Sequence, residues 1–283
     1  GSLYSRIAGI TNSISGMPSN TLIVPAAVEP KDARRFNSVP SRIANTGKLS
    51  KVFSAFDPSA GGEVLDDMKL QVPEDRITDQ LSLVSKLDKL KRQLDSSDAI
   101  HQASSIQQQA VDVLMNGVGE AFNFTKEDPR LIERYDTSKF DVPKAAVDRR
   151  KNKDAIRGHS PISLGKQMLL ARRLCEAGCR FITVSSPGWD MHGAHEFAIT
   201  DGMPVLGPAV DKAVSAFIDD INDRGLSENI LLVITGEFGR TPKINDKGGR
   251  DHWGNLCPLV FVGGGLKMGQ VIGESDKKGS EPI

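Results

Sequence analysis

Apolar positions follow a regular pattern in the second half of the chain, from residue 161 onward. Two segments place apolar side chains at spacings of three and four, as in an amphipathic helix, and a glycine follows each segment. Three short apolar runs are typical of buried strands. The predicted helices are 163–177 and 203–224, and the predicted strands are 181–184, 230–235 and 258–262. This order predicts an α/β fold with a mostly parallel mixed sheet flanked by helices, in which the second helix crosses right-handedly between two parallel strands, 181–184 and 230–235.

The first 160 residues are more polar, and their pattern is mostly helical. A short apolar run at 21–24, bounded by prolines, predicts a strand. Apolar spacings over 76–94 and 98–122 predict two amphipathic helices that pair with each other. The charged segment 137–157 has few apolar residues and is interpreted as a surface connection. We expect one domain over residues 1–283, with a helical, partly irregular portion at 1–160 and an α/β portion at 161–283.

Charge and cysteine content narrow the classes of partner. The 36 basic and 36 acidic side chains balance, so no global field favours nucleic acid or an anionic membrane. No apolar run reaches the roughly 18 residues that span a bilayer. Three cysteines, an odd number, do not predict a disulfide framework. Cys175 and Cys179 are interpreted as small buried side chains, and a metal-binding role is left open for Cys257, which lies near a charged loop.

The loop at 188–195 follows the predicted strand 181–184 and contains Asp190 and His192. Residues two apart in an extended segment point to the same side, so this pair can present a carboxylate oxygen and an imidazole nitrogen to one ion. The alternative is a hydrogen-bonded turn without a metal. His195 is a further donor or, as we prefer, a solvated loop residue.

A second loop, at 236–253, follows the next predicted strand and carries both carboxylates and imidazole. Glu237, Asp251 and His252 are further candidate ligands for a divalent metal such as Zn²⁺, Mn²⁺, Mg²⁺ or Ca²⁺. Arg240 and Arg250 have the donor geometry that binds a tetrahedral anion. Because ligands bind beyond the carboxyl ends of parallel strands, both loops are expected to contribute to one site. The alternative is a glycine-rich surface loop whose charged residues form ordinary ion pairs.

Several blocks of this sequence resemble the family known as domain of unknown function 1501 (DUF1501), which is related to the sulfatases and the alkaline phosphatase superfamily. The blocks are Gly-Trp-Asp-x-His at 188–192, Gly-Glu-Phe-Gly-Arg-Thr-Pro at 236–242, Gly-Arg-Asp-His-Trp at 249–253, and Gly-Gly-Gly at 263–265 followed by Gly-Gln-Val-Ile-Gly at 269–273. The resemblance implies an alkaline phosphatase-like or sulfatase-like α/β fold in a bacterial, extracytoplasmic protein. It also implies a metal site that hydrolyses phosphate or sulfate esters, with a small anionic ester or a sulfated or phosphorylated glycan as substrate.

By motif position, Asp190, His192 and His252 would bind one metal. Glu237 stands where the superfamily usually has an Asp-His pair, and Asp251 is the remaining candidate ligand. The superfamily's nucleophile and first acidic ligand come from an N-terminal strand and helix, and no counterpart precedes Asp190.

The chain starts and stops inside the family's usual sequence, so we expect a fragment, or a diverged member, with little hydrolase activity. If the chain is active, the first candidates for the nucleophile are Ser185, Ser186 and Thr241. Two hypotheses follow: a metal-dependent phosphatase or sulfatase, and a non-catalytic structural or binding protein on the same fold.

Overall fold

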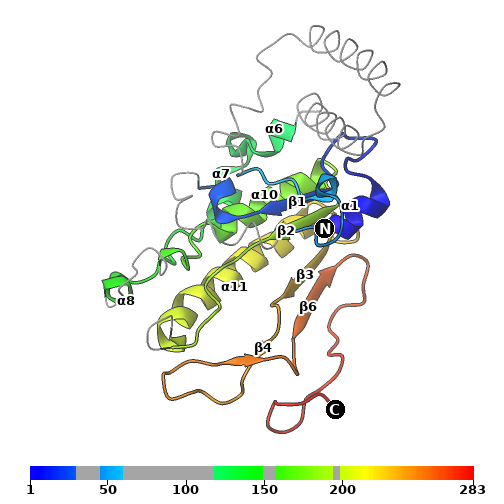
Figure 1. The fold of residues 1–283 in the computed structure, drawn as a ribbon. Helices are drawn as coiled ribbons and strands as arrows, with labels where there is room; N and C mark the ends of the chain where they lie inside the picture. The colour runs from blue at the N-terminus through cyan, green and yellow to red at the C-terminus, as the bar shows by residue number, and fades with distance from the viewer. Residues whose placement is uncertain (30–44, 60–117, 149–156, 194–197) are drawn as a thin grey trace, which may run out of the picture. The chain divides into compact units, whose positions relative to one another are not determined.

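The computed structural model describes residues 1–29, 45–59, 118–148, 157–193 and 198–283, in two compact units. The predicted helix at 76–94, most of the one at 98–122, and His195 lie outside the described residues. Figure 1 labels most of the helices and strands used below. Among the residues described, no helix is both long enough and apolar enough to cross a membrane.

Unit 1 is built on a parallel pair of strands, β1 (Asn20–Ile23) and β2 (Phe181–Val184), with Asn20 opposite Phe181 and Ile23 opposite Val184. All four residues of β1 are buried. Phe56 extends the ladder on the other side of β1, since the Leu22 N–H donates to Phe56 O at 2.9 Å. Both strands were predicted, β2 with the same bounds. The short helices of this unit are α1 (Ser2–Ala8), η1 (Pro25–Ala27), η3 (Lys51–Phe53), α6 (Val118–Ala121) and η4 (Phe124–Lys126).

The helices of unit 2 form its core. They are α7 (Pro129–Tyr135), α8 (Lys144–Asp148), α11 (Ile199–Asp223) and most of α10 (Leu164–Glu176), whose last turn belongs to unit 1. The predicted helices 163–177 and 203–224 are therefore confirmed, although α11 begins four residues earlier and contains two prolines. Gly178 and Gly225 follow these helices with φ of 101° and 67°, which is the left-handed conformation that ends a helix.

One buried cluster in unit 2 joins α8, the start of α11 and the first site loop. It consists of Val142, Ala146, Val147, Met191, Val205 and Leu206. Three of these residues lie in the segment 137–157, so its interpretation as a purely surface connection was wrong. Few apolar residues occur there, but Val142 just before α8, and Ala146 and Val147 within it, are buried in this cluster.

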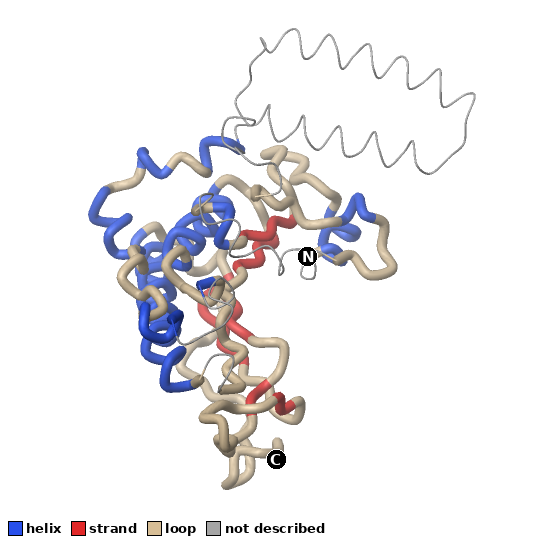
Figure 2. Tube along the Cα trace, turned by 60° about the vertical axis from the view of Figure 1, so that its left-hand side comes forward, coloured by secondary structure: helices blue, strands red, loops and turns tan. Residues whose placement is uncertain are grey.

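The strands of unit 2 form nested antiparallel ladders. β3 (Leu231–Thr235) pairs with β6 (Leu259–Gly263), and between them β4 (Gly239–Arg240) pairs with β5 (His252–Trp253). The chain between β3 and β6 contains no helix, so it doubles back and the pairing is antiparallel. Figure 2 shows this C-terminal part of the chain as short red strands connected by long tan loops.

The mixed α/β class is confirmed, but the sheets are small. The described residues form three two-stranded sheets, and one of them is parallel. The larger, mostly parallel sheet that the sequence predicted is not seen in these residues. The parallel alignment of 181–184 with 230–235 stays a prediction, because β2 and β3 belong to different units.

Candidate metal centre

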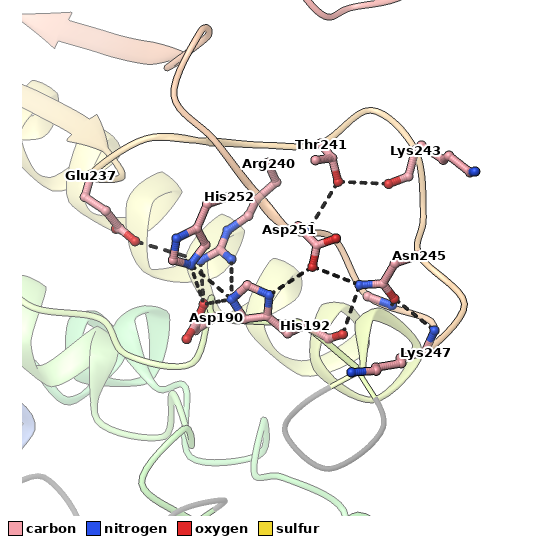
Figure 3. Close-up of polar contacts among 11 residues, drawn as sticks. Asp190, His192, Glu237, Arg240, Thr241, Lys243, Asn245, Lys247, Asp251 and His252 are labelled. Carbon is pink, nitrogen blue, oxygen red and sulfur yellow. Dashed lines mark hydrogen bonds and ion pairs between the residues drawn. The ribbon is translucent and has the colours of Figure 1, made fainter.

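The first site loop is anchored by a buried residue between two polar ones. Met191 is 8% exposed and packs in the core cluster with Val205 and Leu206. Neighbouring side chains of an extended segment point to opposite sides, so burial of Met191 turns Asp190 and His192 together toward the second loop. Figure 3 shows that the Asp190 and His192 side chains meet, with Asp190 Oδ1 2.8 Å from His192 Nε2, so the two face the same way as predicted.

Glycines allow the two loops to approach at backbone distance. Gly193 and Gly248 form an isolated antiparallel bridge, and the Arg250 N–H donates to Met191 O at 2.9 Å. A Cβ atom on Gly249 would overlap the carbonyl group of His192, and one on Gly193 would overlap the carbonyl group of Lys247. These glycines thus allow the backbones of the two loops to touch, and this contact brings the side chains of both loops into one site.

The short β4–β5 ladder places the second set of side chains. Arg240 and His252 are directly opposite each other in its register. Gly239 lies so close to Leu256 O that a side chain there would collide with the backbone. Beyond His252, the Trp253 indole N–H donates to Ser280 O at 2.6 Å and ties β5 to the C-terminal segment.

Three potential ligand atoms converge on one point from these elements. Asp190 Oδ1 lies 2.8 Å from His192 Nε2 and 3.5 Å from His252 Nε2, and the two imidazole nitrogens are 3.0 Å apart. Two ligands held about 2.1 Å from a single ion lie no more than about 4.2 Å apart. All three separations meet this limit, so these atoms are close enough to share one metal ion. This group of three is the metal-ligand cluster.

Asp251 lies on the opposite side of the His192 ring. Its Oδ1 is 3.3 Å from His192 Nδ1 and accepts a hydrogen bond from Asn245 Nδ2 at 3.1 Å. A proton on Nδ1 that is donated to Asp251 leaves the Nε2 lone pair directed into the metal-ligand cluster. In that tautomer Asp251 orients His192 as a metal requires, without itself facing the other two ligand atoms.

Asn245 holds the second loop in shape. Its amide nitrogen also donates to His192 O at 3.2 Å, and its Oδ1 accepts from the N–H groups of Lys247 and Gly249, both at 3.0 Å. Asn245 was not among the predicted site residues. The Asn-Asp-Lys-Gly-Gly stretch at 245–249 is nevertheless typical of a turn closed by an asparagine side chain, and that signal would have identified it.

Arg240 reaches into the metal-ligand cluster from β4. Its Nη2 lies 2.8 Å from Asp190 Oδ1 and 3.8 Å from Glu237 Oε1, and its Nη1 lies 3.3 Å from His192 Nε2. The side chain is 22% exposed and its guanidinium lies 5.6 Å from the centre of the Phe238 ring. Glu237 meets this group only through Arg240 (Figure 3), whereas Arg250 contributes its backbone N–H to the loop contact described above.

The two carboxylates of the site are ionised more readily than usual. Burial alone would raise the pKa of Asp190, but the Arg240 hydrogen bond and the charges of His192 and Arg240 outweigh it, and the pKa is lowered. The pKa of Asp251 is lowered mainly by its hydrogen bond with His192 and then by the one from Asn245. Both carboxylates are therefore anionic near neutral pH. In this form a carboxylate attracts a cation or accepts a hydrogen bond from an imidazole N–H.

The structure thus brings five predicted site residues into mutual contact, directly or through one neighbour: Asp190, His192, Arg240, Asp251 and His252. Glu237 lies at the edge of the group, and Cys257 lies apart from it, with its thiol 3.6 Å from Thr235 Oγ1. The candidate metal ligands, the carboxylate beside His192 and the arginine come from two loops that are about fifty to sixty residues apart in sequence.

No curated protein and no solved structure matches the chain at a significant level. One family match covers residues 8–283, nearly the whole sequence, and includes every residue of the site just described. The family is described as a protein of unknown function, DUF1501. The chain therefore belongs to the DUF1501 family.

Proposed function

We propose that this protein is a metal-dependent hydrolase of phosphate or sulfate esters, on an alkaline phosphatase-like or sulfatase-like fold. The observation that carries the proposal is the convergence of Asp190 Oδ1, His192 Nε2 and His252 Nε2 within 3.5 Å of one another. A carboxylate and two imidazoles are the three protein ligands found at many catalytic zinc sites, where open coordination positions remain for water or substrate.

The donor set favours some metals over others. Ca²⁺ and Mg²⁺ prefer all-oxygen surroundings, whereas imidazole suits Zn²⁺ and other first-row transition metals. Two of the three donors here are imidazole nitrogens. Among the cations that the sequence left open, we therefore favour Zn²⁺ and then Mn²⁺.

Each neighbouring residue would have a distinct task in such a site. The metal, when bound, would supply Lewis acidity toward an ester oxygen. Asp251 would orient His192 through Nδ1, as carboxylates do behind metal-bound histidines. Arg240 would donate paired N–H groups to the non-bridging oxygens of a phosphoryl or sulfuryl group, where negative charge concentrates.

The openness and charge of this group support the substrate class that we propose. The Asp190 side chain is 61% exposed, so the metal-ligand cluster lies at the surface and is accessible to a bulky ester. An anionic headgroup would match Arg240, while the remainder of the substrate is left outside. A small anionic ester or a sulfated or phosphorylated glycan satisfies both conditions, and such polymers occur outside the cytoplasm, where we propose that the protein acts.

A non-catalytic binding role is the second candidate, and two contacts favour it. Thr241 Oγ1 donates to Lys243 O at 2.9 Å and accepts from the Asp251 N–H at 3.1 Å, so this hydroxyl is committed to the loop rather than poised to attack. Glu237 lies outside the metal-ligand cluster, so the residue that stands in place of the superfamily's Asp-His pair adds no ligand to it. A protein that binds a metal and an anion without turnover would account for both features.

Elemental analysis of purified protein, followed by Zn²⁺ and Mn²⁺ titration, tests the metal proposal. We expect one metal per chain, and loss of binding in His192→Ala and His252→Ala. Asp246→Asn, which changes an exposed carboxylate in the same loop, is the control and should retain the metal. Hydrolysis of aryl phosphate or aryl sulfate esters that these histidine variants abolish would support the enzyme, whereas binding without turnover would favour the second candidate. Absence of metal binding by the unaltered protein would refute the proposal.

A further inference from the structure

Arg240 contacts the same oxygen atom that the proposed metal would need. Its Nη2 lies 2.8 Å from Asp190 Oδ1, the oxygen that also faces the Nε2 atoms of His192 and His252. The Nη1 of the same guanidinium lies 3.3 Å from His192 Nε2. Two of the three ligand atoms of the metal-ligand cluster are thus within hydrogen-bond distance of one arginine.

A guanidinium and a divalent cation cannot share these atoms without a cost. Arg240 remains charged at every accessible pH, so it cannot relieve the repulsion by losing a proton. The lone pair of His192 Nε2 can serve one partner at a time. Where a metal binds to Asp190 and His192, the Arg240 side chain must therefore give up at least part of its contact with both residues.

The surroundings of Arg240 provide a second position for the side chain. Glu237, 68% exposed, lies 3.8 Å from Nη2 on the side away from His192, and the Phe238 ring supports the guanidinium plane at 5.6 Å. A rotation within the arginine side chain would keep these neighbours and direct the paired N–H groups outward. In that position the guanidinium matches a tetrahedral oxyanion next to the metal.

We propose that Arg240 couples the two ligands of this site: it competes with the metal for Asp190, and an oxyanion relieves the competition by drawing the guanidinium away. This inference rests on the proposed metal site and predicts how a metal and an oxyanion affect each other's binding there. By thermodynamic linkage, an oxyanion should strengthen metal binding, and metal should strengthen oxyanion binding by the same factor.

Zn²⁺ affinity, measured by competition with a chromophoric chelator, tests the coupling without any activity assay. The proteins are wild type, Arg240→Met, and Lys243→Met as a control that removes one positive charge from the same loop. Lys243 is exposed and its side chain points away from the metal-ligand cluster in Figure 3. Each titration is repeated in sodium sulfate and in sodium chloride at equal ionic strength, so that general screening is held constant.

We expect Arg240→Met to bind Zn²⁺ about five- to tenfold more tightly than wild type in chloride, a coupling of ordinary size. Sulfate should strengthen Zn²⁺ binding by wild type and by Lys243→Met, and should have no effect on Arg240→Met. Arg240→Gln, with matching circular dichroism and thermal unfolding, repeats the measurement should the methionine variant fold poorly.

Two results would overturn the coupling and are distinct from failure of the metal site. One is an affinity of both Arg240 variants equal to or weaker than that of wild type. The other is an equal response to sulfate in Arg240→Met and Lys243→Met. If none of the proteins binds Zn²⁺, the metal site and the coupling are both refuted.

Discussion

The Nε of Arg172 lies 2.8 Å from Oδ2 of Asp220, and the two side chains are only 1% and 3% exposed. This pair connects α10 with α11 in unit 2. Arg172 Nη2 also lies 2.8 Å from Glu127 Oε1, and Asp220 accepts from Tyr135 Oη at 3.0 Å. Burial, and then the charge of Asp220, raise the pKa of Tyr135 well above its ordinary value, so its hydroxyl remains a donor. Removing a partner of such a buried charge lowers the stability of the folded protein, because the remaining charge is neither paired nor solvated.

Arg172→Met should therefore destabilise the protein strongly. The variant removes the more deeply buried of the two cations that Glu127 and Asp220 share and leaves only the partly exposed Arg224, a change that costs up to about 3–5 kcal/mol. Arg134→Met is the matched control: Arg134 pairs with Asp219 and Asp223 at 3.0 and 3.2 Å, but its side chain is 42% exposed. Loss of such surface pairs costs about 0–1 kcal/mol. Urea unfolding of both variants gives the comparison, and equal losses would contradict the assigned role of burial.

Gly249→Ala, which adds a methyl group, should weaken metal binding, although residue 249 is not one of the candidate metal ligands. The added Cβ would overlap the His192 carbonyl group and push the two loops apart. A site tolerates displacements of only ~0.5 Å before its geometry fails. Gly254→Ala is the control, because its Cβ would meet no atom within 4 Å. Zn²⁺ titration should show a lower affinity for Gly249→Ala than for wild type, whereas Gly254→Ala should bind Zn²⁺ as tightly as wild type.

Asp251→Asn should lower metal affinity without removing it. The amide keeps the size of the side chain but no longer stabilises a proton on His192 Nδ1, and loss of such orienting partners typically costs about 10–100-fold in affinity. Asp190→Asn removes a ligand and should cost more. The order of affinities, wild type above Asp251→Asn above Asp190→Asn, is the diagnostic. If Asp251→Asn were the more damaging change, Asp251 would be a ligand itself, as the motif comparison first implied.

The three cysteines should differ sharply in reactivity. Burial raises the pKa of the Cys175 thiol to about 12, and burial also raises that of Cys179, whose Sγ lies 3.2 Å from Thr21 Oγ1. Thiolate is the reactive form, so both should resist alkylation at pH 8. Cys257 is exposed. Iodoacetamide labelling read by mass spectrometry should modify Cys257 alone in native protein and all three cysteines in denaturant. Rapid native labelling of Cys179, which is buried, or of Cys175, which is half-buried, would contradict their raised pKa values.

The elements that the sequence predicted well are those whose signal is local. β2 was predicted at 181–184 and α10 at 163–177 because an apolar run or a 3.6-residue period lay between glycines. α11 began four residues earlier than predicted, at Ile199, so that Pro204 lies beyond the first turn of the helix instead of at its second residue. Packing of Val205 and Leu206 in the core cluster holds that first part in helical form despite the prolines.

Pairing between distant segments was harder to predict. Whether β3 pairs in parallel or antiparallel depends on the path of residues 236–258, which hydrophobic periodicity does not describe. For the site, the alternation of Asp190, Met191 and His192 sufficed to place two ligands on one side. The separation of roles between His252 and its neighbour Asp251 could not be predicted, because it depends on which nitrogen of His192 each residue faces.

The 60-residue spacing between His192 and His252 gives the metal-ligand cluster a topological consequence. An ion bound to both would close a ring of chain that contains all of α11 and β3. Closing a ring of that size by a permanent link removes unfolded-state entropy equivalent to about 4 kcal/mol. Metal binding and the integrity of this part of the chain would then be one equilibrium. A chelator would open the ring much as a reductant opens one closed by a disulfide, and the ion would serve the fold as a reversible cross-link.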